Sequence, residues 1–109
     1  MSALLVQTTL PSEGEAGAIA RAAVEARLAA CAHVDRIASV FRWDGAVREA
    51  EEWRVWLKTT AAAREALFAL VARLHPYDEP ALIALPIVHG APSFLDWIAS
   101  ETGGPPPAP

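Results

Sequence analysis

The 109 residues suit a single domain with a small core, because domains commonly contain about 100–150 residues. A net charge of −4 with dispersed arginines is typical of a mixed, solvated surface and excludes a basic stripe for nucleic acid. No apolar run approaches the roughly 18 residues of a membrane span, and a single cysteine allows no internal disulfide, so we expect a cytoplasmic protein with no nucleic-acid or membrane partner.

The first predicted elements are a strand at residues 3–9 and a helix at residues 13–30. The strand ends before Pro11, and Ser12 with Glu15 forms a capping-box pattern at the start of the helix. The alanine-rich stretch that follows is a strong helix former. Its apolar stripe consists of Ala16, Ile19, Ala20, Ala23, Val24 and Leu28.

Two β-rich runs follow between residues 32 and 60, and Asp44-Gly45 between them predicts a hairpin turn. The second run has Trp53, Val55, Leu57 and Thr59 on one face and Arg54, Trp56 and Lys58 on the other. Helices on one side of such a sheet would leave one tryptophan in water. We therefore expect a neighbouring subunit to cover the second face.

The remaining elements are a helix at residues 61–74, a strand at 81–88 and a short helix at 93–102. Apolar residues recur at helical spacing in the first of these, and Pro76 helps to end it. Pro86 marks an edge, a bulge or the exit of the strand. Ser93 is the expected cap of the last helix.

The element order β-α-β-β-α-β plus a terminal helix predicts an α+β, ferredoxin-like sandwich: a four-stranded antiparallel sheet with two helices on one face. The bare second face is where subunits would meet. Residues 1–102 are expected to form the one domain. The Gly/Pro-rich tail at 103–109 cannot form a core and is expected to be disordered.

Lys58 is the only lysine in the chain, which favours a specific role as a point charge for an anion or as a titratable amine. Cys31 and His33 point the same way on a regular strand, and both suit soft ions such as Cu(I). Two ligands do not make a site, however. A lone cysteine is also commonly a small buried hydrophobe.

The stretch from His75 to Pro80 concentrates polar side chains in a loop held between two prolines. His75 is a candidate metal ligand or titrating group, and equally a candidate helix cap. Tyr77, Asp78 and Glu79 accompany it. No catalytic set can be assigned from the residues, so an enzyme is not expected.

Five motifs in order resemble the CutA1 divalent-cation tolerance proteins. They are RLAACAHV, SVFRWDG, EEWRVWLKTT, LHPYDEPALIALPIV and FLDWI, and the match runs from residue 4 to 102. The resemblance implies a homotrimer of ferredoxin-like subunits with long hairpins that pair across subunit boundaries. It also implies similarity to PII-type signalling trimers, which bind small ligands in clefts between subunits.

The family resemblance implies a role in divalent metal tolerance and homeostasis, notably of copper, with bound metal ions. Cys31, His75 and either Asp78 or Glu79 are then the candidate metal ligands; relatives commonly carry Glu where this chain has Asp78. The alternative is a PII-like sensor that binds an anionic small molecule in an intersubunit cleft. That cleft would be lined by Lys58, His75, Tyr77 and Trp43. A third reading is an enzyme in the same cleft, with His75 as acid and base and Lys58 as electrostatic stabiliser.

Overall fold

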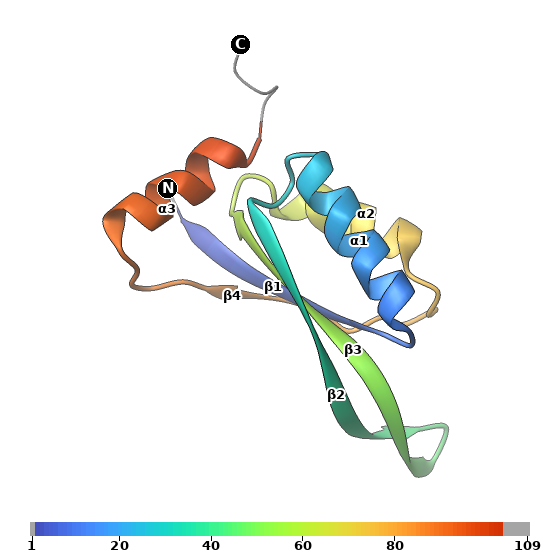
Figure 1. Cartoon of the computed structure of the whole chain (residues 1–109). Coiled ribbons are helices and arrows are strands. Elements are labelled where there is room, and N and C mark those ends of the chain that lie inside the picture. Colours follow the sequence, from blue (N-terminus) through green and yellow to red (C-terminus); the bar gives the residue numbers. More distant parts are fainter. Residues whose placement is uncertain (1, 104–109) are drawn as a thin grey trace.

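Four strands form a single antiparallel sheet in the computed structural model, which describes residues 2–103 (Figure 1). In chain order the elements are β1 (Ala3–Leu10), α1 (Glu13–Glu25), β2 (Cys31–Trp43), β3 (Ala46–Thr60), α2 (Arg64–Leu74), β4 (Leu82–Pro86) and α3 (Pro92–Glu101). The strand order is β2-β3-β1-β4, with α1 and α2 on one face. The predicted ferredoxin-like order is confirmed. The predicted tail lies outside the described residues except for Gly103.

One of the two predicted helix caps is present. The Ser12 hydroxyl accepts a hydrogen bond from the Glu15 N–H at 3.2 Å and donates to the Glu15 carboxylate at 2.7 Å. These bonds satisfy an otherwise free donor at the start of α1. The prediction for Ser93 is wrong, because α3 begins at Pro92, and its cap, Ala91, forms no side-chain bond. Proline at the first helical position needs no donor of its own, so the helix starts without a polar cap.

Helix α1 ends at Glu25, earlier than the predicted Ala30, because Arg27 adopts a left-handed conformation with φ of 60°. The Leu28 N–H then bonds to the Ala23 carbonyl at 3.0 Å, which closes the helix end. Glycine usually occupies the position that Arg27 holds here, since a left-handed backbone costs other residues free energy. Alanine-rich composition gives no signal of such an ending.

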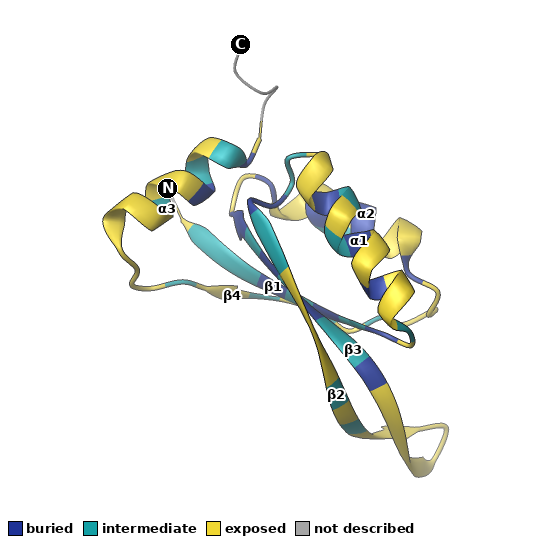
Figure 2. Ribbon diagram, viewed as in Figure 1, coloured by how far each residue is buried: buried dark blue, intermediate teal, exposed yellow. Residues whose placement is uncertain are grey.

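The hairpin between β2 and β3 is the longest feature of the molecule. Asp44 and Gly45 have φ values of 50° and 76°, the positive pair that a tight hairpin turn of this type requires. Pairing runs without a slip from Trp43–Ala46 at the turn to Cys31–Lys58 at the base. Strand β1 reaches only Trp53 of β3, so the rest of the hairpin extends beyond the sheet as a two-stranded arm (Figures 1 and 2).

The core lies between the sheet and the two helices. Inward side chains of β1 and β3 alternate with outward ones, as the pattern of β3 predicted. The fully buried residues of this cluster are Val6, Leu10, Ala16, Ile19, Ala23, Ala29, Val55, Leu57, Leu67 and Val71. Burial of each Val, Leu or Ile side chain contributes about 1.5–3 kcal/mol to the free energy of folding.

No helix among the described residues has the length and apolar character that crossing a bilayer requires.

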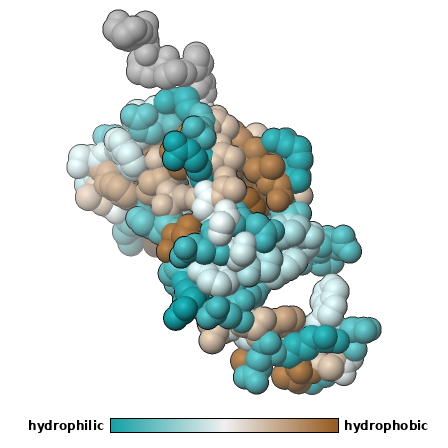
Figure 3. All heavy atoms as spheres, turned by 45° about the vertical axis from the view of Figure 1, so that its right-hand side comes forward, coloured by the Kyte–Doolittle hydropathy of each residue, from teal (hydrophilic) through white to brown (hydrophobic). Residues whose placement is uncertain are grey.

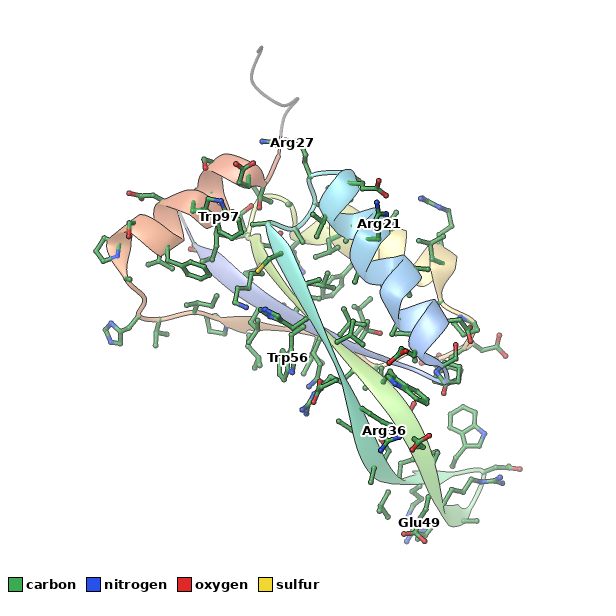
Figure 4. All side chains as sticks on the ribbon, in the orientation of Figure 1. Arg21, Arg27, Arg36, Glu49, Trp56 and Trp97 are labelled. Carbon is green, nitrogen blue, oxygen red and sulfur yellow. The ribbon has the colours of Figure 1, made fainter. Side chains whose placement is uncertain are left out.

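The opposite side of the sheet, called the open face below, carries the second set of β3 side chains. Trp53 packs against the core, whereas Trp56 points away from α1 and α2 (Figure 4). The predicted division of the two tryptophans is confirmed.

Two predicted element boundaries are corrected. Helix α2 begins at Arg64 and not at residue 61, because Thr60 starts a turn that takes up residues 61–63. Strand β4 ends at Pro86 on an edge of the sheet, where proline's missing donor is tolerated.

Candidate functional site

The predicted site residues fall into separate places in one chain. Cys31 and Lys58 are directly opposite each other in the β2–β3 ladder. His75 and Tyr77 belong to the loop between α2 and β4, and Trp43 lies at the hairpin turn. Lys58 pairs with Leu5 of β1, whereas His75 bonds to Thr9 of the same strand. These two β1 positions are four residues apart, which is about 13 Å along a strand. A single chain therefore does not bring Lys58 and His75 together.

His75 is buried, with 8% of its surface exposed, and both of its ring nitrogens are engaged. Nδ1 accepts a hydrogen bond from the Tyr77 backbone N–H at 3.2 Å, so the ring proton is on Nε2, which donates to the Thr9 carbonyl at 2.8 Å. Its backbone N–H bonds to the Val71 carbonyl at 2.9 Å and closes α2. The neutral ring thus ties three segments together, and neither nitrogen is free for a metal.

Tyr77 and Glu52 form a second polar contact beside His75. The phenol donates to the Glu52 carboxylate at 3.1 Å, and Glu52 is only 8% exposed. Burial first, then this hydrogen bond and the negative charges of Glu52 and Glu15, raise the pKa of Tyr77 to about 12. Sequence reasoning missed Glu52, an acid in the strand run beside Trp53. Glu52 ends an acidic run with Glu49 and Glu51, so nothing in the local sequence distinguishes it from its exposed neighbours.

Three other predicted residues are exposed. Asp78 and Glu79 lie on the surface of the loop, and neither forms a hydrogen bond or ion pair with any residue between 2 and 103. Trp43 is exposed at the hairpin turn, where its backbone carbonyl accepts from Arg48 Nε at 3.3 Å. These three side chains are free to contact another molecule.

The Lys58 cluster, made of Cys31, His33 and Lys58, lies on the open face near the base of the hairpin. Lys58 Nζ is 3.2 Å from His33 Nδ1. An ammonium can only donate, so His33 Nδ1 is the acceptor and a neutral ring carries its proton on Nε2. Cys31 is a free, half-buried thiol opposite Lys58. The predicted shared direction of Cys31 and His33 is confirmed, and Lys58 is added to them.

The next residues along the open face are held in an ion pair. Arg54 donates from Nη2 and Nε to the two oxygens of Asp35 at 2.7 and 3.2 Å, and its guanidinium lies 5.3 Å from the Trp56 ring centre. The hydrogen bond from Arg54 lowers the pKa of Asp35. Asp35 is therefore committed to Arg54 and leaves Lys58 without a carboxylate partner in the part of the chain described.

No group of three or more His, Cys, Asp or Glu side chains is placed to hold a metal ion among residues 2–103. Cys31 and His33 share a face, but the ammonium of Lys58 occupies His33 Nδ1 at 3.2 Å and repels a cation there. His75 has no free nitrogen lone pair. The donor set of one chain does not fit a complete metal site.

Comparison with known proteins gives a consistent result. The family model described as CutA1 divalent ion tolerance protein matches residues 4–101. The divalent-cation tolerance protein CutA of Thermus thermophilus is 45% identical over 100 residues, which cover 91% of this chain and 97% of that protein.

Solved structures agree with this match. A divalent cation tolerance protein (Cut A1) from Thermus thermophilus superimposes with a TM-score of 0.90 at 43% identity, covering 93% of this chain and 99% of that one. The structure of an Archaeoglobus fulgidus protein, described as the periplasmic divalent cation tolerance protein CutA, gives a TM-score of 0.89 at 34% identity. It covers 91% of this chain and 97% of that one.

Proposed function

Because the chain belongs to the CutA1 divalent ion tolerance protein family, we propose that it acts in divalent metal tolerance as a homotrimer that binds metal ions, copper among them. The observation that carries the proposal is the match over residues 4–101, which includes every strand and helix except for one residue at the start of β1. The Cys31 thiol and the His33 imidazole on one face supply the ligand types that soft copper ions prefer.

The metal would bind between subunits. One chain separates Cys31 from the loop that carries His75, Asp78 and Glu79, so a complete donor set needs a second copy. In that assembly the two acids are free to act as ligands. His75 could join them only by giving up the hydrogen bond between its Nδ1 and the Tyr77 N–H.

Self-association is supported by apolar side chains that remain exposed. On the hairpin arm, Val40 and Val47 are 67% and 63% exposed, and Phe41 and Trp43 accompany them (Figure 3). On the open face, Ile83 and Leu85 of the edge strand β4 are also exposed. Covering such surface stabilises an assembly by about 25 cal/mol per Å². Light scattering should give about three times the 11.6 kDa chain mass; a monomer would contradict the proposal.

Calorimetry with Cu(I), Cu(II) and Zn(II) tests metal binding. Wild-type protein is expected to bind at least one of these ions with a dissociation constant below roughly 1 μM, equivalent to about −8 kcal/mol. Cys31→Ser should weaken Cu(I) binding most, because a hydroxyl is a poor ligand for a soft ion. Binding of all three ions weaker than roughly 1 μM would contradict a specific metal site.

A second candidate function is favoured by the missing carboxylate at Lys58. In this proposal an anionic small molecule binds in an intersubunit cleft lined by Lys58, His75, Tyr77 and Trp43. Assembly is again required, since one chain keeps these residues apart. A thermal-shift screen of nucleotides and organic acids tests it, because a bound ligand raises the melting temperature by mass action. A stabilising ligand should lose its effect in Lys58→Ala and keep it in Cys31→Ser.

We also propose a cytoplasmic location, which is supported by a chain whose single cysteine rules out an internal disulfide. The Archaeoglobus relative is described as periplasmic, so the compartment calls for a direct test. Fractionation of cells that produce the native gene product should place it with cytoplasmic markers. Recovery in a periplasmic or secreted fraction would contradict this location.

A further inference from the structure

The Lys58 cluster combines several hydrogen-bond donors with one surplus positive charge. We propose that Lys58 and His33, with Cys31 beside them, bind a small oxyanion, meaning a phosphate or carboxylate group. The inference rests on the second candidate function and sharpens it. The ligand class is thereby narrowed from any anionic small molecule to an oxyanion. His33 of the same chain becomes the second binding residue, although it was not among the residues of the proposed intersubunit cleft.

Several donors of the Lys58 cluster have no acceptor among residues 2–103. Lys58 has three N–H groups, and one points to His33 Nδ1 at 3.2 Å, which leaves two. With Nδ1 accepting, His33 presents its Nε2–H, and the ring is exposed. The Cys31 thiol, opposite Lys58 in the ladder, adds a weak donor. Ammonium and imidazole N–H groups that share one side of a sheet are suited to an oxyanion, whose oxygens accept from several donors at once.

The charge around Lys58 points to the same class of ligand. The one carboxylate in the neighbouring ladder positions, Asp35, is held at 2.7 Å by Arg54. The open face beyond Lys58 on β1 and β4 is formed by uncharged side chains, namely Leu5, Gln7, Ile83 and Leu85. Lys58 is half-buried, where an ammonium attracts an anion more strongly than in open water.

A metal cation is disfavoured at the same place as long as Lys58 is charged. Lys58 occupies the His33 Nδ1 lone pair that a metal would need, and its charge opposes a second cation nearby. The oxyanion site therefore needs the positive charge of Lys58, whereas that charge opposes metal binding. Removing its charge should weaken anion binding without weakening metal binding.

Lys58 can be followed by itself, because it is the only lysine in the chain. An amine-reactive ester should label Lys58 and the α-amino group, and mass spectrometry after proteolysis separates the two. With inorganic phosphate or acetate present in parallel samples at about ten times its dissociation constant, labelling of Lys58 is expected to slow by about tenfold, because only the anion-free fraction reacts. The α-amino group should label at an unchanged rate and is the internal control. The more protective of the two ions identifies the anionic group that the site prefers.

Calorimetry with the more protective ion separates the possible outcomes. Lys58→Gln and His33→Gln should each weaken binding by about tenfold or more, whereas Arg42→Gln, an equal charge loss on the exposed hairpin arm, should not. If only Lys58→Gln weakens binding, His33 is not part of the site and this inference is overturned, while the intersubunit cleft survives. If neither ion binds or protects Lys58, both the inference and the cleft proposal fail. If Lys58 is labelled slowly even without added anion, a carboxylate of a neighbouring chain already binds its ammonium. That result also overturns the oxyanion site.

Discussion

Two histidines in this molecule show how a fold can use the same side chain in different ways. His75 is buried, and both ring nitrogens bond within its own chain, to Thr9 and Tyr77. His33 is exposed, and among residues 2–103 its ring forms one hydrogen bond, with Lys58. The first histidine joins β1 to the loop after α2. The second keeps its Nε2–H exposed in the single chain.

The contrast extends to the neighbours of each histidine. Beside His75, the buried Glu52 carboxylate has a donor in Tyr77, so donors and acceptors match. Beside His33, Lys58 has N–H groups without an acceptor, and no carboxylate among residues 2–103 pairs with it. Buried polar groups must be satisfied for the fold to be stable, whereas surplus donors at a surface are retained without such a need. Function is therefore better sought at the Lys58 cluster.

Replacing His75 with alanine should have the largest effect. The change leaves the Thr9 carbonyl and the Tyr77 amide without their partners, so the free energy of unfolding should fall by about 3 kcal/mol. Urea denaturation at fixed protein concentration measures this loss. His33→Ala is the matched control and should change stability by less than about 0.5 kcal/mol. Equal losses in the two variants would abolish the contrast between the histidines.

Removing the hydroxyl of Tyr77 should have a smaller effect. Tyr77→Phe leaves the buried Glu52 carboxylate without its donor, so the free energy of unfolding should fall by about 1.5 kcal/mol. A double-mutant cycle with Glu52→Gln isolates this contact. A coupling energy near zero would show that the hydrogen bond contributes nothing to stability.

Alkaline pH should weaken the same contact. The pKa of Tyr77 is about 12 in the folded chain against an ordinary value of 10.0, so the folded state holds the proton more tightly. The resulting stability is complete below pH 10 and is lost as pH rises toward 12. Because Tyr77 is 38% exposed, solvent screening limits the loss to about 1 kcal/mol.

Tyr77 is the only tyrosine, so phenolate absorbance reports its titration alone. The midpoint should lie near 12 in the wild-type protein and move toward the ordinary 10.0 in Glu52→Gln. A wild-type midpoint at the ordinary value would contradict the hydrogen bond between the Tyr77 phenol and the Glu52 carboxylate.

Neutralising Lys58 should have the smallest effect on stability. Lys58→Gln removes a charge that has no carboxylate partner in the described chain, so the free energy of unfolding should change by less than about 0.5 kcal/mol. The same urea experiment used for His75→Ala measures it. A loss comparable to that of His75→Ala would place Lys58 among the residues that hold the fold together.

The fold could be predicted largely from local patterns. The hairpin at Asp44-Gly45 and the two faces of β3 follow from turn chemistry and strand alternation, which act over a few residues. The early end of α1 could not be predicted, because Arg27 takes a conformation that composition does not favour.

The site contacts were less accessible to sequence reasoning. The partners in Tyr77–Glu52 and in Lys58–His33 are each 25 residues apart, and His75 and Thr9 are 66 apart. Such contacts depend on strand register and on the path of the loop after α2. The motifs identified His75 and Lys58 as residues of interest, but only the structure assigns them to different places.

The most direct test of the contrast is an NMR titration of the imidazole nitrogens with inorganic phosphate. Before phosphate is added, His75 should show the tautomer with its proton on Nε2 and Nδ1 as acceptor. Addition of phosphate should shift the His33 signals and leave those of His75 unchanged. Shifts of His75 with unchanged His33 would contradict the account, because the loop after α2 would then be where the ligand binds.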